Sequence, residues 1–397
     1  MIVRIEEARH GDILQADIAD SSGRLLFPKG AGLTEPIIKA LQQRGVMEID
    51  VVGEMQPLNV RLLAKAREYA QKFYAGHDVT IAPGLVLLGL RTEAEARLLE
   101  MGRPPLWRGC EGPAGPAPAS ADLPVFCLQH FSPPELPAVA RELNHVLSSP
   151  DPCTRDVADV IGRSPGLSTR LLRLVNSPLY SLQGKVETLT RAVTIVGLQE
   201  IGMLASGLVM VEQFGVIPRT VVDMRSFLEH CLGCALAART LAALTGRVDA
   251  DQAFVAGLLH DLGRLYYFTA FPERSRFCID SALKHGRPLL TEEADYFGAD
   301  HCVMGMRLMD GWAMPRALSQ AVAFHHDPSR ADESDLPTLI HLADLLVHAM
   351  GIGCSGECGP PLVQAGCMDR VGLKSEQLEQ VAAEVGEKLE AIVRAFQ

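Results

Sequence analysis

A chain of 397 residues can hold two or more domains, and its 48% apolar but only 5% aromatic residues favour helix packing over a β-rich fold. The formal charge of −11 argues against broad, charge-driven binding to nucleic acid, which needs a basic surface. The N-terminus lacks the apolar core of a signal peptide, and we expect no stretch to reach the length needed to span a membrane. Ten cysteines without an export signal predict reduced thiols and a cytoplasmic location.

Residues 1–55 predict a small α+β, β-rich N-terminal domain. Two short apolar runs flank Ser22-Gly23, which is a hairpin signal. A helix is expected from Thr34 to Arg44, where Gly45 stops it, and residues 48–52 resemble a strand. We expect this domain to serve in interaction or sensing.

Residues 56–102 predict a helical connector, with amphipathic helices over 58–74 and 92–101 and a break at Pro83-Gly84. Residues 103–124 contain six prolines among glycines and alanines. Such a composition cannot bury enough apolar surface to order itself, so it predicts a linker and a domain boundary.

Residues 125–351 show helical periodicity almost throughout, and residues 352–397 predict a Cys/Gly loop followed by a C-terminal helix. Asp251 is expected to cap the helix that carries His260. Pro315 suits the first turn of the helix that carries His325, and Pro328 is expected to close it. Gly351 suits the end of a helix that starts near Asp335. Asn176 is expected to cap or cross-link helices.

Four residues of this helical region predict a metal site: His230, the adjacent pair His260-Asp261, and Asp344. Imidazole and carboxylate together suit divalent iron, manganese, nickel or zinc. A buried carboxylate costs several kcal/mol, by order of magnitude, unless a cation or donor compensates it. Three more histidines make a second metal position conceivable, namely His301, His325 and His326.

Each of these residues also has a plain structural interpretation. His230 could be a hydrogen-bonded packing residue, and the face that Asp344 shares with His341 and His348 could be a solvated polar stripe. The pair His325-His326 could simply end a helix with favourable charge.

The cysteines are interpreted as structural or incidental. Cys231 and Cys234 have no second pair at zinc-ribbon distance. The loop cysteines Cys354, Cys358 and Cys367 supply three thiols, which do not close a tetrahedral site.

Five stretches in order resemble the HDOD branch (HD-related output domains) of the HD superfamily. These stretches are Leu136-Pro137-Ala138-Val139, the run from Leu171 to Tyr180, the run from Ala192 to Gly197, the pattern His301-x3-Gly305-x2-Leu308-x3-Trp312-x2-Pro315, and His325-His326. The N-terminal segment resembles the small β-rich segments found ahead of HDOD and HD-GYP domains. The resemblance implies a mainly α fold and favours His260, Asp261 and Asp344 as metal ligands, while His341 and His348 stay undecided.

The resemblance also implies two competing functions. One is a bacterial signal-transduction protein whose HDOD domain is an interaction or scaffold module, with a signalling protein as its partner. The other is a metal-dependent phosphohydrolase acting on a cyclic dinucleotide or nucleotide second messenger, in which Asp261 bridges two metals and Arg264 clamps a phosphate. Two departures from the pattern of the related hydrolases weaken the phosphohydrolase hypothesis. No Gly-Tyr-Pro element follows His326, and Ser226 stands where related trimetal enzymes place a carboxylate. We therefore favour the regulatory function.

Overall fold

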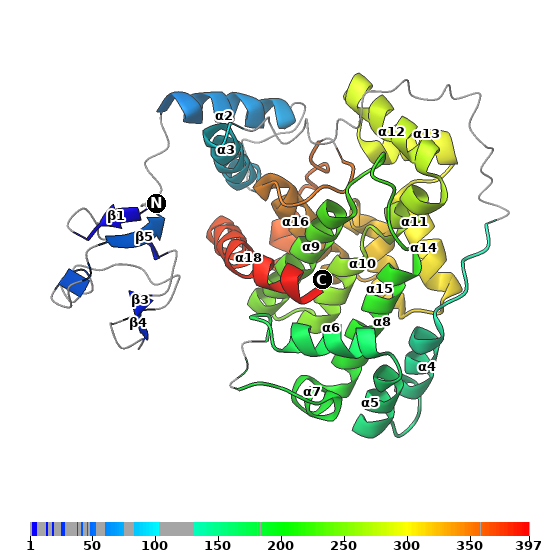
Figure 1. Ribbon diagram of the computed structural model, residues 1–397. Helices are drawn as coiled ribbons and strands as arrows, with labels where there is room; N and C mark the ends of the chain where they lie inside the picture. The colour runs from blue at the N-terminus through cyan, green and yellow to red at the C-terminus, as the bar shows by residue number, and fades with distance from the viewer. Residues whose placement is uncertain are drawn as a thin grey trace. The chain divides into compact units, whose positions relative to one another are not determined.

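The computed structural model describes parts of residues 2–52, then 60–74, 83–102, 131–180, 182, 184–357 and 359–396. The chain divides into two compact units, residues 1–65 and residues 66–397, and each is described by itself. The expected mainly α fold is confirmed, because almost every element of the second unit is a helix (Figure 1).

The first unit contains short strands that pair antiparallel. Strand β5 (Glu48–Val52) lies between β1 (Ile2–Arg4) and β2 (Ile13–Leu14). Strands β3 (Ile18–Ala19) and β4 (Leu25–Phe27) pair with each other. A small core of Ile5, Leu14, Leu41 and Ile49 lies in this unit. The predicted turn at Ser22-Gly23 and most of the predicted helix over 34–44 fall outside the described residues.

Two helices precede the predicted linker: α2 (Val60–Phe73) and α3 (Gly84–Glu100). The expected start of the second helix at residue 92 was wrong, because α3 already begins at Gly84, directly after Pro83. A helix needs no backbone donor at its first positions, so proline is tolerated there. Helix α3 packs against α16 and α18. The linker residues 103–124 lie outside the described residues.

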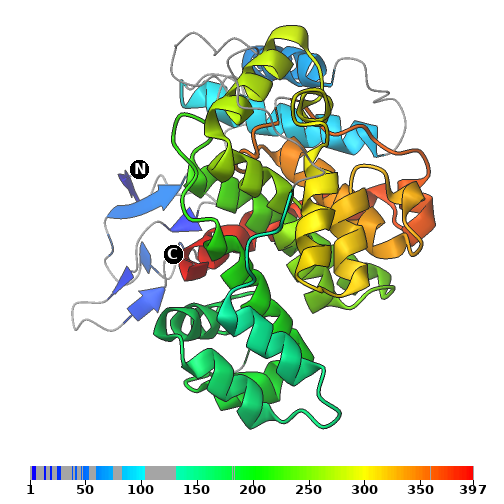
Figure 2. The ribbon, with the colours of Figure 1, turned by 90° about the vertical axis from the view of Figure 1, so that its right-hand side faces the viewer.

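The rest of the second unit is a helical bundle. Figure 2 shows a first group of helices, in blue-green and green, below the others. This group comprises α4 (Ala138–Leu147), α5 (Thr154–Gly162), α6 (Pro165–Val175) and α7 (Leu189–Val196). Asn176 holds the chain together after α6, since its side chain donates to the Leu172 and Val186 carbonyls and accepts from the Val186 N–H. Its expected capping and cross-linking role is confirmed.

The larger group carries the candidate site. Its helices are α8 (Leu198–Gln213), α9 (Met224–Thr245), α10 (Ala250–Leu259), α11 (Leu262–Ala270), α12 (Pro272–His285), α13 (Leu289–Phe297), α14 (His301–Gly311), α15 (Arg316–Phe324), α16 (Asp335–Met350), α17 (Cys367–Val371) and α18 (Ser375–Phe396), with the short 3₁₀ turn η4 (Pro328–Arg330) after α15. Gly351 ends α16 in the left-handed conformation, as expected.

Helix α9 lies at the centre of this group, in contact with α10, α16 and α18. By length and composition it could cross a membrane, and so could the α7–α8 pair if its two helices, bent by 118°, formed one span. The expectation that no stretch reaches such a length was therefore wrong for α9. Its apolar sequence is accounted for by packing, since 72% of that stretch is buried inside the protein.

The start and end of α10 differ from the expectation. Asp249, not Asp251, caps the helix by accepting from the Gln252 N–H at 2.7 Å. The carboxylate of Asp251 instead accepts from Tyr180 and Arg239, which ties α10 to neighbouring elements. The helix ends at Leu259, so His260-Asp261 lies in the turn between α10 and α11 rather than within a helix.

Candidate metal centre

The four residues expected to form a metal site come from separate elements and meet in the core. His230 lies on α9, His260-Asp261 in the turn after α10, and Asp344 on α16. Nε2 of His230 lies 3.3 Å from Nε2 of His260 and 3.3 Å from Oδ1 of Asp344. Oδ2 of Asp261 lies 3.4 Å from His260 Nε2 and 3.8 Å from His230 Nε2. All four side chains are buried.

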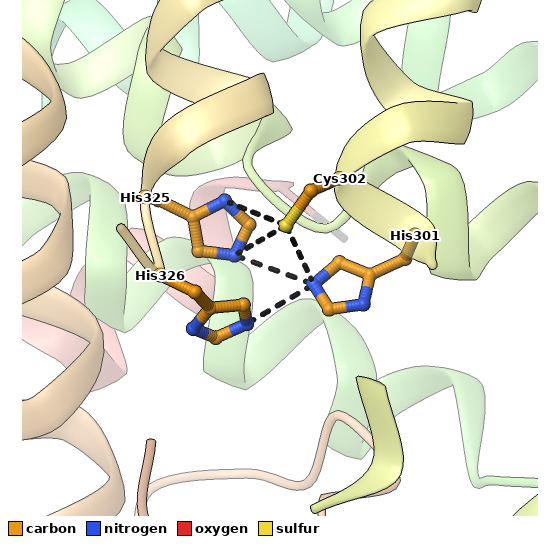
Figure 3. A group of neighbouring side chains, drawn as sticks. All are labelled: His301, Cys302, His325 and His326. Carbon is orange, nitrogen blue, oxygen red and sulfur yellow. Dashed lines mark hydrogen bonds between the residues drawn. The ribbon is translucent and has the colours of Figure 1, made fainter. Parts of the chain in front are cut away.

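The three further histidines form a second group beside the first. His301 begins α14, and His325-His326 follows α15 (Figure 3). Nε2 of His301 lies 3.4 Å from Nε2 of His325 and 3.1 Å from Nε2 of His326. Asp261 connects the two groups, because its Oδ1 lies 3.4 Å from His301 Nε2 while its Oδ2 faces His230 and His260.

Hydrogen bonds on the far side of three rings determine which nitrogen faces the centre. Nδ1 of His260 faces the Gly257 carbonyl and Nδ1 of His325 faces the Val322 carbonyl, each at 2.8 Å. Nδ1 of His301 faces the Glu293 carboxylate at 2.5 Å. Carbonyl and carboxylate oxygens only accept, so Nδ1 carries hydrogen and Nε2 of each neutral ring points a lone pair inward.

The converging lone pairs fit a cation. Two buried carboxylates and several imidazole nitrogens face one another, an arrangement that is repulsive unless positive charge lies between them. Asp261 Oδ1 also accepts no hydrogen bond from any described residue. The donor set of the first group, two nitrogens and two carboxylates, suits divalent first-row metals.

The pKa directions agree with a demand for positive charge. Burial alone would lower the pKa of His260, but the Asp261 carboxylate outweighs it and raises that pKa. Burial would also raise the pKa of Asp261, yet Arg264 and His260 hold it well below its ordinary value. Burial dominates elsewhere, lowering the pKa of His230 to about 4 and that of His325 to about 3.

A second layer of residues orients the donors. Glu293 on α13 accepts from both the ring and the backbone N–H of His301. His348, one turn after Asp344, places its Nε2 3.3 Å from Asp344 Oδ1. His341 holds the backbone instead, because its Nδ1 donates to the His325 carbonyl and its Nε2 accepts from a backbone N–H. His348 therefore supports a candidate ligand, and His341 supports the loop after α15.

Arg264 does not fit the expected role of a phosphate clamp. It is 1% exposed, and its guanidinium contacts Asp261 at 3.4 Å, Glu293 at 3.1 Å and Glu357 at 2.7 Å. It also donates to the Ser355 hydroxyl. Four of its five N–H donors are engaged by these partners and the side chain is buried, so Arg264 is placed to position Asp261 and Glu293 rather than to bind a phosphate.

Close helix contacts at two glycines bring the donors together. A Cβ at Gly257 on α10 would lie 2.7 Å from the Ala235 Cα on α9. A Cβ at Gly263 on α11 would overlap the His301 backbone oxygen and lie 2.8 Å from the Gly305 nitrogen on α14. Only a residue without a side chain allows these backbones to approach so closely.

The fold and site now place the chain among known proteins. The profile of the HDOD domain matches residues 134–328. Residues 134–328 form an HDOD domain. Asp344 lies beyond the matched residues, on α16. An uncharacterized protein of Treponema pallidum is 26% identical over 215 residues, which are 53% of this chain and 40% of that protein. The chain therefore matches less than half the length of this relative.

Solved structures share the HDOD fold. A Geobacter sulfurreducens HDOD domain protein of unknown function has a TM-score of 0.54 at 23% identity, covering 67% of this chain and 93% of that one. A candidate phosphohydrolase from Shewanella amazonensis has a TM-score of 0.54 at 22% identity, covering 66% and 95%. A candidate signal transduction protein from Marinobacter aquaeolei has a TM-score of 0.52 at 17% identity, covering 87% and 69%.

Some residues at the HDOD site had no signal in the sequence. Glu293 lies eight residues before His301, and only the turn between α13 and α14 brings the two together. Cys234, interpreted as incidental, has its Sγ 3.7 Å from His230 Nε2 and 4.0 Å from Asp344 Oδ1. Cys302 lies equally close to the second histidine group.

The loop cysteines do not join this site among the described residues. Cys367 is buried, and Cys354 Sγ accepts from the Gly356 N–H at 3.4 Å. Cys358 lies outside the described residues.

Proposed function

We propose that this chain is a signal-transduction protein whose HDOD domain holds a divalent metal ion and acts by binding a partner rather than by turnover. One observation carries the proposal. Nε2 of His230 and Nε2 of His260 each lie within 3.8 Å of a carboxylate oxygen of Asp261 and of Asp344, and all four side chains are buried. Iron, manganese, nickel and zinc are the ions that suit this donor set.

Burial supports binding over catalysis. A catalytic metal keeps one position open for water or substrate, whereas a structural metal is enclosed by protein donors. His230, His260, Asp261 and Asp344 are each at most 2% exposed, and Arg264 is occupied by carboxylates. A metal enclosed in this way stabilises the folded helices, and so sets the surface that the HDOD domain presents to a partner.

A second candidate function is metal-dependent phosphohydrolysis. The observation in its favour is a cavity of about 270 Å³ that is lined by His326 and Cys302 and reaches the second histidine group. A bound metal would lower the pKa of a coordinated water and polarise a phosphoryl oxygen. The cavity is smaller than the roughly 300–1,000 Å³ of sites for drug-sized ligands, so a cyclic dinucleotide is a poor fit.

Metal content and hydrolysis are the measurements that test the proposal. The purified protein is expected to contain a divalent metal and to show no multiple turnover of cyclic dinucleotides or nucleoside phosphates. The double variant His260→Ala/Asp261→Ala should lose the metal and unfold at lower temperature. The matched control, His145→Ala/Asp151→Ala, removes an exposed histidine and an exposed aspartate and should retain both properties.

Two results would contradict the proposal. A protein that binds no divalent metal when exposed to excess would remove its basis. Metal-dependent turnover that the double variant abolishes and the control variant retains would favour the phosphohydrolase instead.

A further inference from the structure

Cys302 belongs to the second histidine group by position. It follows His301 on α14, and its side chain is directed at the rings of His301 and His325 (Figure 3). Its Sγ lies 3.5 Å from His301 Nε2 and 4.0 Å from His325 Nε2. One donor atom from each of His301, Cys302, His325 and His326 lies within 4.8 Å of every other.

The distances between these donor atoms suit a tetrahedrally coordinated ion. With ordinary zinc bond lengths, a tetrahedral site places two ligand nitrogens about 3.3 Å apart, and a ligand nitrogen and sulfur about 3.6 Å apart. The nitrogens of His301 and His325 are 3.4 Å apart, and those of His301 and His326 are 3.1 Å apart. Cys302 Sγ lies 3.5 Å from the nearest of them. It lies 4.0 Å from His325 Nε2, so binding an ion would bring these two atoms closer by a few tenths of an ångström, while the other three distances need smaller changes.

We propose that Cys302 is the fourth ligand of a separate, zinc-preferring site completed by His301, His325 and His326. Its three nitrogens and one thiolate are softer than the two nitrogens and two carboxylates around His230. Thiolate donors select zinc over manganese or magnesium, so the two sites differ in metal preference. Metal binding forms the metal–sulfur bond and displaces the thiol proton to solvent.

The surroundings supply what such a site needs. Glu293 and the Val322 carbonyl orient the rings of His301 and His325 with Nε2 inward. The cavity of about 270 Å³ is lined by both Cys302 and His326, which provides an entry path for the ion. This inference rests on the metal-binding part of the proposed function. Its four donors are nevertheless different residues from His230, His260, Asp261 and Asp344.

Cobalt substitution tests the role of Cys302. The metal-free full-length protein is titrated with Co²⁺, and near-ultraviolet sulfur-to-cobalt charge-transfer absorption is recorded, together with competition by Zn²⁺. The unmodified protein should show this absorption, and Cys302→Ser should lose it. The variant should also bind one zinc equivalent more weakly, by more than the roughly 10–100-fold that loss of an outer partner costs.

Two matched cysteine variants exclude other sulfur ligands. Cys278→Ser changes a buried thiol whose Sγ lies 3.8 Å from a backbone carbonyl, away from the histidines. Cys234→Ser changes the thiol beside His230. Both should retain the absorption. Absorption that survives Cys302→Ser, or disappears in Cys234→Ser alone, would overturn the proposal.

One more variant separates this site from the first. Asp344→Asn should remove the metal held near His230 while the Cys302-dependent absorption remains. No change in metal content in Asp344→Asn would contradict the proposed function without affecting the Cys302 site. A protein that binds no Co²⁺ near Cys302, with its histidines only hydrogen-bonded to one another, would overturn the Cys302 site.

Discussion

Glu293 is not itself a candidate metal ligand, but its contacts position residues that are. It contacts the ring and backbone of His301 and also the guanidinium of Arg264, which in turn contacts Asp261. Burial alone would raise the pKa of Glu293, but His301 and Arg264 hold it at about 2. Its carboxylate is therefore charged at neutral pH and fixes the orientation of His301.

We expect Glu293→Gln to weaken metal binding about 10–100-fold, as loss of an outer partner typically does. The neutral amide keeps the shape but no longer stabilises the oriented ring. The matched control is Glu292→Gln, since Glu292 is equally buried but pairs with Arg287 rather than His301. Chelator competition measures both affinities. Equal affinities in the two variants would contradict this role of Glu293.

The raised pKa of two histidines predicts a pH dependence of metal binding. His260 and His301 have pKa values above the ordinary 6.5: for His260 the Asp261 carboxylate outweighs burial, and for His301 Cys302 and Glu293 outweigh burial and Arg264. Below its raised pKa such a ring is protonated in the metal-free protein and must release its proton to bind metal. His230 and His325, whose pKa values burial lowers, release none.

Metal affinity should therefore rise with pH while these two rings are protonated, and displacement of the Cys302 thiol proton, whose pKa burial raises, extends the rise at the second site. Calorimetry in two buffers with different ionisation enthalpies measures the protons released per metal bound. We expect a net release near pH 7. No net proton release, or an affinity that does not rise with pH, would show that the two rings are neutral in the metal-free protein.

The sequence identified most of the buried side chains that converge in the candidate site, but not the residues that surround them. His260, Asp261 and Asp344 could be selected because charged or titratable groups among apolar residues need compensation, whatever the fold. Glu293 and Cys302 could not be selected, because their roles depend on the turn between α13 and α14 and on the direction of one side chain. The carboxylate contacts of Arg264 were not predicted for the same reason, since two of its three partners, Glu293 and Glu357, come from distant parts of the chain.

At the scale of elements, the crossing of α11 and α14 determines where His301 lies. Gly263 and Gly305 allow the two backbones to touch, so the start of α14 is held beside the turn that carries Asp261. The helical pattern predicted the existence of these helices but not the break at His260-Asp261, because the apolar run continues across it. Local periodicity contains no information on how closely two helices approach.

Gly263→Ala should push α11 away from α14 and displace His301. We expect a loss of about 1–3 kcal/mol in the free energy of unfolding, typical of overpacking, together with weaker metal binding. The control is Gly89→Ala on α3, where an added methyl would meet nothing within 4 Å. That change should stabilise the protein by about 0.4–1 kcal/mol. Denaturant unfolding measures both, and a neutral Gly263→Ala would contradict the close crossing.

At the scale of the whole molecule, α3 ties the residues before the predicted linker to the HDOD region. Arg91 on α3 pairs with Glu95 at 2.9 Å, and both are almost fully buried. Arg91 also donates to the His348 carbonyl on α16 at 3.0 Å and stacks over the Phe73 ring on α2 at 3.6 Å. The ring of His348 in turn contacts Asp344, so His348 links α3 to the candidate metal centre.

This packing predicts the outcome of limited proteolysis. Cleavage should occur first within residues 103–124, where proline, glycine and alanine dominate the sequence. The two fragments should then stay associated on gel filtration, because the buried contacts between α3 and α16 do not depend on the cut segment. Arg91→Met should weaken their association, since it removes the hydrogen bond to the His348 carbonyl on α16 and the buried ion pair with Glu95.

The control for this experiment is Lys72→Met, which removes the exposed ion pair with Glu68 on the neighbouring helix α2 and should leave the fragments together. Far-ultraviolet circular dichroism of the uncut variants checks that each is folded before cleavage. If the fragments of the unsubstituted protein elute separately, α3 is not held by α16 in solution, and the linker divides two independent domains. Association that survives in Arg91→Met would instead assign the contact to the apolar residues of α3 alone.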